Sequence, residues 1–438
     1  MSEIKTVNIG LAGLGNVGAG VYKNLLKNAD LLTGRVGSKI QVGKIAVRNL
    51  DKARDVDVPA ELITGDWREV IADPSLPIIV ELIGGTTEAY DLVKAAILAG
   101  KTVITGNKAL LAERGMELVE LAEAKNVPLY FEAAVAGGIP IIKAVREALI
   151  GNQIQAIYGI INGTTNYILT RMSDAGLSYE VALGEAQAAG YAEADPTLDV
   201  NGWDAGHKAL VLAWISYGRW IRPSDIYVEG IEKIAPIDLN FARSMGYQIK
   251  LVAIVRLDAS NRVEVRVQPS LLPRHHILAN VNGVFNAVAV YGDIVGETLS
   301  YGSGAGQDAT SSSVISDLAD AADNLINEAG TNGGFIPTGR YGDCLPVNET
   351  ISSYYLRLRV ADVPGVVAKV AGALSDHGIG ISSIVQPETE GTAEADLMLM
   401  LHAAPYGKMK LASDQIAQLS CVKSTPVLIR VESLPGKK

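Results

Sequence analysis

The chain has 438 residues, of which 20% are charged and 48% are hydrophobic, and its formal net charge is -10 at pH 7. This length exceeds what one hydrophobic core serves, so we expect about two to four globular domains. The acidic balance offers no broad basic patch to a phosphate backbone, which excludes nucleic acid as an expected partner.

The cysteine count, the first residues and the apolar stretches of the sequence favour a cytoplasmic protein with no membrane partner. The two cysteines, Cys344 and Cys421, are too few for a disulfide framework or a thiolate zinc cage. The first residues show no signal-peptide pattern, and no apolar stretch approaches the roughly 18 to 20 residues of a membrane span. The five histidines lack zinc-binding spacing, so we expect no catalytic transition metal.

Residues 1–136 alternate short β-rich apolar runs with longer helical patterns. This alternation predicts βαβ units, and therefore an α/β domain in which helices cover both faces of a Rossmann-type parallel sheet. The apolar runs are TVNIGLA, IQVGKIAV, IIVELI, TVIT and PLYFEAAV.

The remaining chain changes pattern twice. Residues 137–345 combine long helices, one of them through Asp204 and Trp214, with alternating strands such as NRVEVRVQP, which favours an α+β domain. A polar boundary, YGDCLPVNET, follows. Residues 353–438 then predict a ferredoxin-like βαββαβ domain with strands YYLRLRV, ISSIVQPE, ADLMLML and TPVLIRV and a helix over VVAKVAGALSDHG.

A glycine-rich turn follows the first predicted strand. Gly13, Gly15 and Gly18 form G-x-G-x-x-G, in which the first glycine permits a tight turn, the second admits a pyrophosphate and the third allows close helix packing. A purely structural turn is the alternative reading. The residues predicted to bind a dinucleotide here are Gly13, Leu14, Gly15, Asn16, Val17 and Gly18.

The end of the second predicted strand bears on the choice of cofactor. Arg48 stands where an NAD-preferring site would place an acid on the ribose, and a guanidinium suits a 2′-phosphate. The sequence therefore favours NADP(H) over NAD(H). The alternative is a solvated arginine with Asp51 in the acidic role.

Acidic residues gather in GYAEADPTLDVNGWDAGHKA, which holds Glu193, Asp195, Asp199, Asp204 and Lys208. Asp204 and Lys208 are four residues apart, so a helix places them on one face. Carboxylates suit a substrate ammonium group, and a lysine can transfer a proton beside a carbonyl. A helix start with dipole-favouring acids and an exposed ion pair explains the pattern equally well.

Two further segments qualify as site candidates. Lys108 follows the strand TVIT, at the carboxyl edge of the sheet where such folds bind ligands. INGTTNYIL, residues 161–169, places hydroxyl and amide side chains before a helix, which serves a bound carboxylate or a helix cap.

Together these segments resemble the homoserine dehydrogenase family over essentially the full length. The resemblance rests on GLAGLGNVGAGV, GNKALLA, INGTTNYIL, GYAEADPTLDVNGWDAGHKA, NGVFNAV and GSGAG, in the family's order. It implies reversible hydride transfer between L-homoserine and L-aspartate 4-semialdehyde. The α+β domain would then be catalytic and dimerising, with a segment near 303–340 returning to the nucleotide domain. Because no kinase region precedes the glycine turn, we expect a monofunctional enzyme.

The resemblance also implies roles for individual residues. Lys208 matches the proton-transfer lysine, Lys108 a lysine near substrate and nicotinamide, and Asp199 an acid near the reacting group. Glu193 and Asp204 match substrate-binding acids, and Gly306 lies in a segment that returns to the nucleotide. A sodium ion is implied on main-chain oxygens of Glu132, Val135, Gly137 and Ile139.

The C-terminal segment resembles an ACT domain, a module that binds small amino acids. This likeness implies L-threonine as an effector near Gly365 and Gly378, and a homodimer or homotetramer. Two departures from the family pattern are Trp203, where a smaller aliphatic residue is usual, and GAGQDATSS, which lacks a common proline. The rival hypotheses are a dehydrogenase of another amino acid and a non-catalytic amino-acid sensor.

Overall fold

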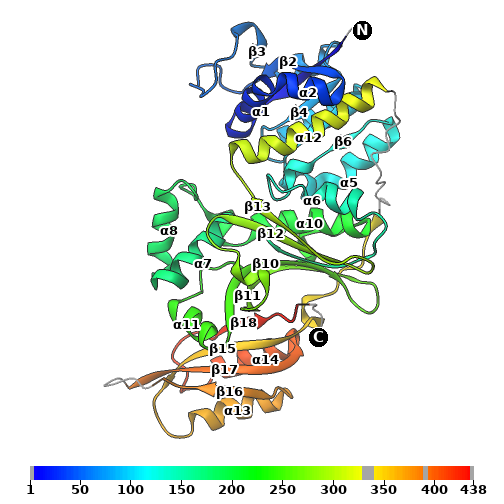
Figure 1. Ribbon diagram of the computed structural model, residues 1–438. Helices are drawn as coiled ribbons and strands as arrows, with labels where there is room; N and C mark the ends of the chain where they lie inside the picture. The colour runs from blue at the N-terminus through cyan, green and yellow to red at the C-terminus, as the bar shows by residue number, and fades with distance from the viewer. Residues whose placement is uncertain (1–3, 328–339, 388–392, 435–438) are drawn as a thin grey trace. The chain divides into compact units, whose positions relative to one another are not determined.

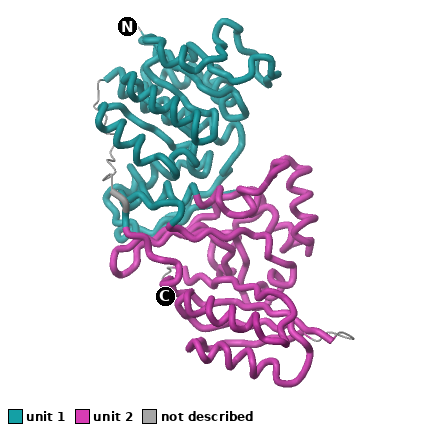
Figure 2. The backbone as a smooth tube through the Cα atoms, turned by 180° about the vertical axis from the view of Figure 1, so that it is seen from behind, with its two compact units in different colours: residues 1–157, 207–224, 285–342 teal, residues 158–206, 225–284, 343–438 magenta. Residues whose placement is uncertain are grey.

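The computed structural model describes residues 4–327, 340–387 and 393–434. Its chain divides into two compact units, which Figure 2 shows in different colours. No helix among the described residues is long and apolar enough to cross a membrane. The units consist of residues 1–157, 207–224 and 285–342, and of residues 158–206, 225–284 and 343–438. The sequence analysis divided the chain into three continuous domains, whereas these two units are each made of several segments. The three domain bounds therefore stay predictions.

Unit 1 contains the expected parallel sheet. Its strands lie in the order β3-β2-β1-β4-β5-β6, with every neighbouring pair parallel, which confirms the Rossmann-type prediction. The strands are β1 (Lys5–Ala12), β2 (Ser38–Ala46), β3 (Ile63–Thr64), β4 (Ile78–Glu81), β5 (Thr102–Thr105) and β6 (Leu129–Tyr130).

The last predicted strand of this sheet, PLYFEAAV, is only partly correct. β6 covers Leu129–Tyr130, and a 3-10 turn, η2, takes over at Glu132–Ala134. The reason is a competing partner, because the Glu132 N–H donates to the Asp317 carboxylate at 2.8 Å instead of to a strand.

Helices cover both faces of the sheet (Figure 1). On one face Val314 and Leu318 of α12 share a core with Ile9, and on the other Leu92 of α4 shares a core with Ile79. The first face carries α1 (Asn16–Lys27), α2 (Ala29–Val36) and α12 (Gln307–Ile326), and the second carries α3 (Trp67–Ala72), α4 (Glu88–Leu98) and α5 (Lys108–Lys125). α12 is therefore remote from α1 in sequence but beside it in space.

Unit 1 also holds α6 (Ile141–Lys143), the π-helix η3 (Ala144–Ala148) and the antiparallel hairpin of β12 (Phe285–Gly292) and β13 (Gly296–Ser303). Two elements cross the division between the units along the chain, β7 (Ile154–Ile160) and α10 (Trp203–Tyr217). α10 matches the helix predicted through Asp204 and Trp214.

Unit 2 begins with helices and two long strands. β10 and β11 pair antiparallel along their whole length, from Tyr247 opposite Pro273 to Leu257 opposite Val263. The elements are α7 (Gly163–Ala175), α8 (Tyr179–Ala188), α9 (Thr197–Val200), β9 (Tyr227–Val228), α11 (Pro236–Ser244), β10 (Tyr247–Leu257) and β11 (Val263–Pro273).

The C-terminal part of unit 2 has the predicted βαββαβ order. Its strands lie side by side as β16-β17-β15-β18, and both helices share one apolar core with them. The elements are β15 (Ile351–Ala361), α13 (Val366–Asp376), β16 (Ile381–Val385), β17 (Glu394–Pro405), α14 (Tyr406–Ala417) and β18 (Val427–Val431).

The C-terminal sheet continues directly into the β10–β11 sheet. β18 pairs parallel with β11 where Ser270 faces Arg430. Beside this junction the buried Arg266 guanidinium binds Glu432 through two bonds of 2.7 and 2.9 Å, and Glu264 through one of 2.5 Å. A desolvated guanidinium between two carboxylates strongly disfavours separation of the strands.

A second buried ion pair ties β15 to α11. The Asp238 carboxylate, which is fully buried, accepts hydrogen bonds from Arg357 Nε at 2.7 Å and from the Tyr355 hydroxyl at 2.8 Å. Because α11 also packs on α7, this carboxylate connects the C-terminal domain to the helices before it.

Replacing Arg357 tests this connection. Arg357→Leu strands the Asp238 charge in the core, and we expect unfolding free energy to fall by about 3–5 kcal/mol. The matched control is Arg359→Leu in the same strand, whose pairs with Glu394 and Asp396 are partly exposed, and it should cost about 0–1 kcal/mol. Urea unfolding followed by circular dichroism measures both, and equal losses would contradict the assigned role.

Candidate functional site

The glycine turn has the geometry of a nucleotide-binding turn. Gly13 has φ of 100°, and a Cβ there would lie 2.4 Å from the Leu82 carbonyl oxygen, while a Cβ at Gly18 would lie 2.1 Å from that of Gly13. At Gly15, by contrast, no described atom lies within 4 Å of an added Cβ. Two glycines therefore allow close packing, and the middle one faces open space.

α1 starts directly after this turn, at Asn16, with Gly15 as its N-cap. Among the described residues, no side chain caps it and its first turn holds no acid. Its first backbone N–H groups and positive dipole end suit a phosphate. Arg48 lies two residues past the end of β2, and its side chain is exposed.

The loops at the carboxyl edge of the sheet are organised by Glu81, which sequence reasoning missed. This fully buried carboxylate ends β4 and accepts from the Thr105 hydroxyl at 2.5 Å and the Ile83 N–H at 2.9 Å. Burial raises its pKa, against the opposing effect of these hydrogen bonds. The sequence signal that could have identified Glu81 is a single acidic residue within the apolar run IIVELI.

Lys108 begins α5 at this same edge and is half-buried. The helix is capped by Asn107, whose side-chain oxygen Oδ1 accepts from the Leu110 N–H at 3.1 Å and whose side-chain nitrogen donates to the Gly85 carbonyl at 2.7 Å. Lys108 is thus fixed beside the loop that Glu81 orders.

In unit 2 one amide joins two of the predicted acids. The Asn162 side-chain nitrogen donates to Asp199 Oδ1 at 2.7 Å and to Asp204 Oδ2 at 2.9 Å, and the Thr164 hydroxyl lies 3.1 Å from Asp199 Oδ2. Asn162 is 4% exposed and also caps α7 by accepting from the Thr165 N–H. INGTTNYIL therefore provides a helix cap and a link between acids at once.

Asp204 lies in the first turn of α10, and Lys208 lies one turn later on the same helix. Lys208 is 8% exposed, which is unusual for lysine. Glu193 is exposed. The Asp195 carboxylate does not join the cluster, because it accepts hydrogen bonds from the N–H and the hydroxyl of Thr197 at the start of α9. The structure therefore gathers Asp199 and Asp204 but leaves Asp195 out.

Lys250 is bound to α7, the helix that Asn162 caps, and sequence reasoning did not identify it. Its fully buried ammonium donates to Asn166 of α7 at 3.1 Å, to the Val281 carbonyl at 2.5 Å and to Asn282 at 2.9 Å. Burial lowers the pKa of Lys250 to about 8, with a small opposing effect of the Asp174 charge.

The segment predicted to hold a cation is a buried, sharply turned loop. Ala136 and Gly137 both have positive φ, 55° and 48°, and the Gly137 carbonyl accepts from the Ser313 hydroxyl at 2.6 Å. Glu132, Val135 and Ile139 are buried. Burial raises the pKa of the Glu132 carboxyl to about 7, although it accepts two backbone N–H groups at the start of α6.

The predicted GSGAG segment packs against this loop. A Cβ at Gly137 would lie 2.5 Å from the Gly304 carbonyl oxygen, and the Gly138 N–H donates to the Ser303 carbonyl at 3.0 Å. Gly306, with φ of 114°, is the N-cap of α12.

The two predicted effector residues lie at opposite ends of α13. Gly365 is its N-cap, with φ of 91°, and Gly378 follows its last turn, with φ of 70°. The helix has 11 residues and so is about 16 Å long at 1.5 Å per residue. A ligand of amino-acid size can touch only one of them within one chain.

Family models match most of the chain. A model described as homoserine dehydrogenase matches residues 140–319, its NAD-binding domain matches 13–132, and an ACT domain matches 354–420. A homoserine dehydrogenase of Pseudomonas aeruginosa is 44% identical over 98% of this chain and 100% of its own length.

Solved structures agree with these matches. A homoserine dehydrogenase from Thiobacillus denitrificans aligns with a TM-score of 0.91 at 42% identity, over 98% of this chain and 99% of that one. A hyperthermophilic archaeal homoserine dehydrogenase in complex with NADPH aligns with a TM-score of 0.62 at 28% identity, over 75% of this chain and 100% of that one.

Lys250 generates a pH prediction. Between about pH 8 and 10 the folded lysine is neutral while the unfolded one is still protonated, so its contribution to stability rises with pH. We expect wild type to gain up to about 1.4 kcal/mol per pH unit relative to Lys250→Met in this window. Urea unfolding of both proteins across these pH values measures the difference, and a constant difference would refute the assigned pKa shift.

Proposed function

The chain belongs to the homoserine dehydrogenase family, and from this premise we propose that it catalyses reversible hydride transfer between L-homoserine and L-aspartate 4-semialdehyde. The observation that carries the proposal is the Asn162 amide, which holds Asp199 and Asp204 together one helical turn before the buried Lys208. Such a group of acids suits a substrate that carries an α-ammonium group and a reacting alcohol.

Asp204 and Glu193 bind the substrate ammonium in this proposal. The Asn162 side-chain nitrogen donates one hydrogen bond to each carboxylate, so it orients the Asp204 carboxylate without neutralising its charge. Asp199, bound to the same amide and to Thr164, lies near the reacting carbon.

Lys208 carries the proton of the alcohol, and Lys108 binds substrate beside the nicotinamide. Lysine is one of the side chains that transfer protons in enzymes, and Lys208 lies one helical turn after Asp204 on α10. The helix start at Asn107 fixes Lys108 at the edge of the parallel sheet, where ligands of this fold bind.

The nicotinamide ring of the cofactor would accept the hydride in the oxidised form and donate it in the reduced form. Residues 13–18 hold its pyrophosphate, Gly306 approaches it at the start of α12, and Arg48 binds a 2′-phosphate, which makes NADP(H) the preferred form. The archaeal relative solved with NADPH supports this preference.

Arg48→Ala tests the preference. Because only NADP(H) carries the 2′-phosphate, the substitution should raise KM for NADP+ about tenfold or more, as expected for loss of a charged contact, and leave KM for NAD+ nearly unchanged. Steady-state kinetics with both cofactors measures this, with Lys52→Ala in the same loop as control. Equal losses for both cofactors would remove the assignment of Arg48.

We place a monovalent cation, sodium, on the main-chain oxygens of Glu132, Val135, Gly137 and Ile139. Support comes from the buried loop and its two positive-φ residues, which turn successive peptide groups sharply. The cation would be structural in this reading and would take no part in hydride transfer.

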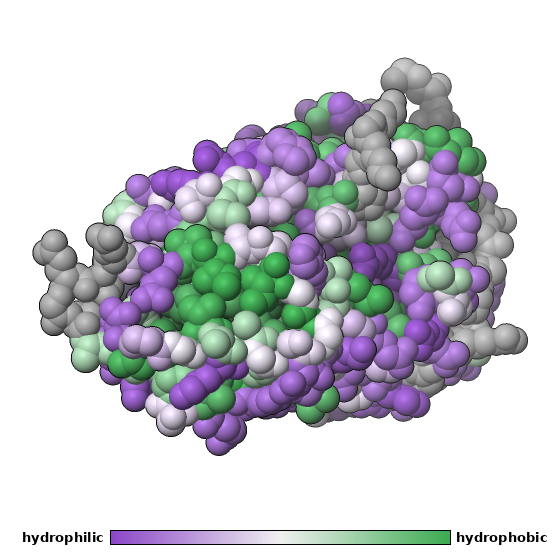
Figure 3. All heavy atoms as spheres, turned by 90° about the horizontal axis from the view of Figure 1, so that it is seen from below, coloured by the Kyte–Doolittle hydropathy of each residue, from purple (hydrophilic) through white to green (hydrophobic). Residues whose placement is uncertain are grey.

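L-threonine is the proposed effector, and the protein is a homodimer or homotetramer. Figure 3 shows an apolar patch on the face that carries the ACT domain, where α13 and β16 lie in Figure 1. Val367 of α13, Ile384 and Val385 of β16, and Val363 in the turn before α13 are exposed. Contact between two copies there would bring Gly365 or Gly378 of one copy near the other, where an amino acid could bridge them.

The proposed activity is tested by reduction of NADP+ or NAD+ with L-homoserine, with and without L-threonine. Wild type should turn over and be inhibited by L-threonine, whereas Lys208→Ala should lose about 10²–10⁴-fold in kcat, the usual contribution of proton transfer. Fluorescence titration should show that Lys208→Ala still binds NADPH. Bound cofactor with no homoserine turnover in wild type would favour the sensor hypothesis.

A further inference from the structure

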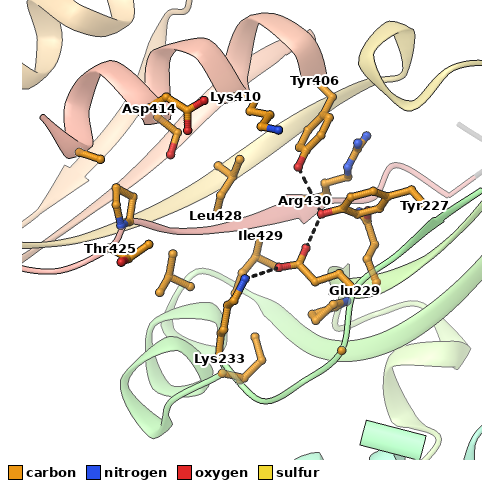
Figure 4. A pocket seen from close by; sticks show the side chains of 18 residues that line it. Tyr227, Glu229, Lys233, Tyr406, Lys410, Asp414, Thr425, Leu428, Ile429 and Arg430 are labelled. Carbon is orange, nitrogen blue, oxygen red and sulfur yellow. Dashed lines mark hydrogen bonds and ion pairs between the residues drawn. The ribbon is translucent and has the colours of Figure 1, made fainter. Parts of the chain in front are cut away.

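A cavity of about 230 Å³ lies within unit 2, where the ACT domain meets β9 and the loop after it (Figure 4). We call it the junction cavity. Its walls come from α14, from β18 and from residues 227–234, with β11 contributing Gln268 and Pro269. A single water needs only about 10–15 Å³, so the space admits a small metabolite.

The junction cavity is separate from the predicted site residues. Its lining includes neither effector glycine, Gly365 or Gly378, and none of Asp199, Asp204 and Lys208. It also lies at β18, which is the opposite end of the ACT sheet from β16 and its apolar patch.

Both facing walls carry a cation and a carboxylate. α14 contributes Lys410 and Asp414, and the opposite wall contributes Glu229 and Lys233 (Figure 4). The Glu229–Lys233 pair is loose, at 3.8 Å, and Lys233 is mostly exposed. Such a pair contributes little to stability, so Lys233 can turn to a ligand at small cost. The Glu229 carboxylate is held in place by the Tyr227 hydroxyl, which donates to it at 2.8 Å.

Gln268 shows that the cavity has unused binding capacity. This side chain lines the cavity and is 2% exposed, yet neither its amide nitrogen nor its oxygen has a hydrogen-bond partner among the described residues. A buried amide left unpaired costs about 1–3 kcal/mol. Both amide atoms are shielded from the cavity space in this structure, so the side chain must turn before it can offer one donor and one acceptor to a polar ligand.

The rest of the lining is mixed. Ile234, Pro269 and Leu428 provide hydrocarbon surface, and Tyr227, Tyr406, Ser413, Thr425 and Arg430 provide hydroxyl groups and a guanidinium. A ligand that fits this lining carries one positive group, one negative group and a short body in a small volume.

We propose that the junction cavity binds a small zwitterionic α-amino acid. Its ammonium binds Glu229 or Asp414, its carboxylate binds a lysine of the opposite wall, and Gln268 satisfies one of the remaining polar atoms. A bound amino acid links the ACT domain, through α14, to the segment that contains Glu229.

This segment touches the acid cluster directly, so occupancy affects substrate binding. The Ile231 N–H donates to the Val200 carbonyl at 2.9 Å, and a Cβ at Gly230 would lie 2.1 Å from the same oxygen. Gly202, two residues before Asp204, packs on the Glu229 carbonyl in turn. Movement of Glu229 toward a ligand therefore shifts the turn between Asp199 and Asp204. The coupling to substrate binding rests on the proposed function, whereas amino-acid binding in the junction cavity is independent of it.

Calorimetric titration of the full chain with each standard L-amino acid tests the binding. At least one should bind, and about tenfold or greater weakening is expected in two variants, Gln268→Leu, which removes the amide, and Ser413→Phe, which fills the cavity from α14. Lys408→Phe on the exposed side of α14 is the matched control, and Gly378→Ala tests the effector turn. The bound amino acid's own alcohol and 2-hydroxy-acid analogues, which lack one charge each, should not bind.

The outcomes separate the possibilities. No binding by any amino acid up to about 10 mM, a weak limit for specific recognition, would overturn the proposal, as would binding that both cavity variants retain but Gly378→Ala loses. Because Ser413 is half-exposed, Ser413→Phe keeps the test valid if Gln268→Leu fails to fold. For coupling, the bound amino acid should change KM for L-homoserine in wild type but not in Ser413→Phe. An unchanged wild-type KM overturns the coupling alone, and absent turnover with intact binding refutes the proposed activity alone.

Discussion

The buried guanidinium of Arg266 is the interaction on which the arrangement of unit 2 depends. It lies between Glu264 of its own strand and Glu432 beyond β18, so it fastens the ACT sheet to the long β10–β11 sheet at their shared edge. Charges without access to water must remain paired. The ACT domain is therefore an extension of the sheet that supports α7 and the acid cluster.

The acid cluster depends on backbone contacts as well as on charge. Asn162 can bridge Asp199 and Asp204 only if the turn between them is held, and glycines at 202 and 230 let that turn and the segment after β9 touch through their main chains. A side chain at either position would separate them. The two glycines, which have no side chain, thus allow the close main-chain contact that positions the acid cluster.

Local patterns predicted most of the architecture, and long-range partners account for the rest. Strand and helix periodicity identified the parallel sheet, α10 and the βαββαβ domain, because each depends on nearby residues. The run PLYFEAAV ended early because Asp317, 185 residues away, took the Glu132 N–H. Glu81 and Lys250 escaped notice for the same reason, since burial and distant partners give them their roles. The pattern of INGTTNYIL predicted a helix cap or a carboxylate site, but it did not reveal that Asn162 joins Asp199 to Asp204. Charge alone could not separate Asp199 and Asp204 from Asp195, whereas the family resemblance assigned roles to Asp199 and Asp204 and none to Asp195.

The shared edge between β11 and β18 has a consequence for any attempt to shorten this protein. Removing the C-terminal domain would open the β11 edge at Ser270 and Leu271, which β18 covers, and would take Glu432 away from the buried Arg266, although β9 would still pair with Arg266 and Val267. Open, apolar strand edges recruit other chains and promote aggregation. The role of the C-terminal domain is therefore better tested by point substitution than by truncation, because this domain also closes the sheet.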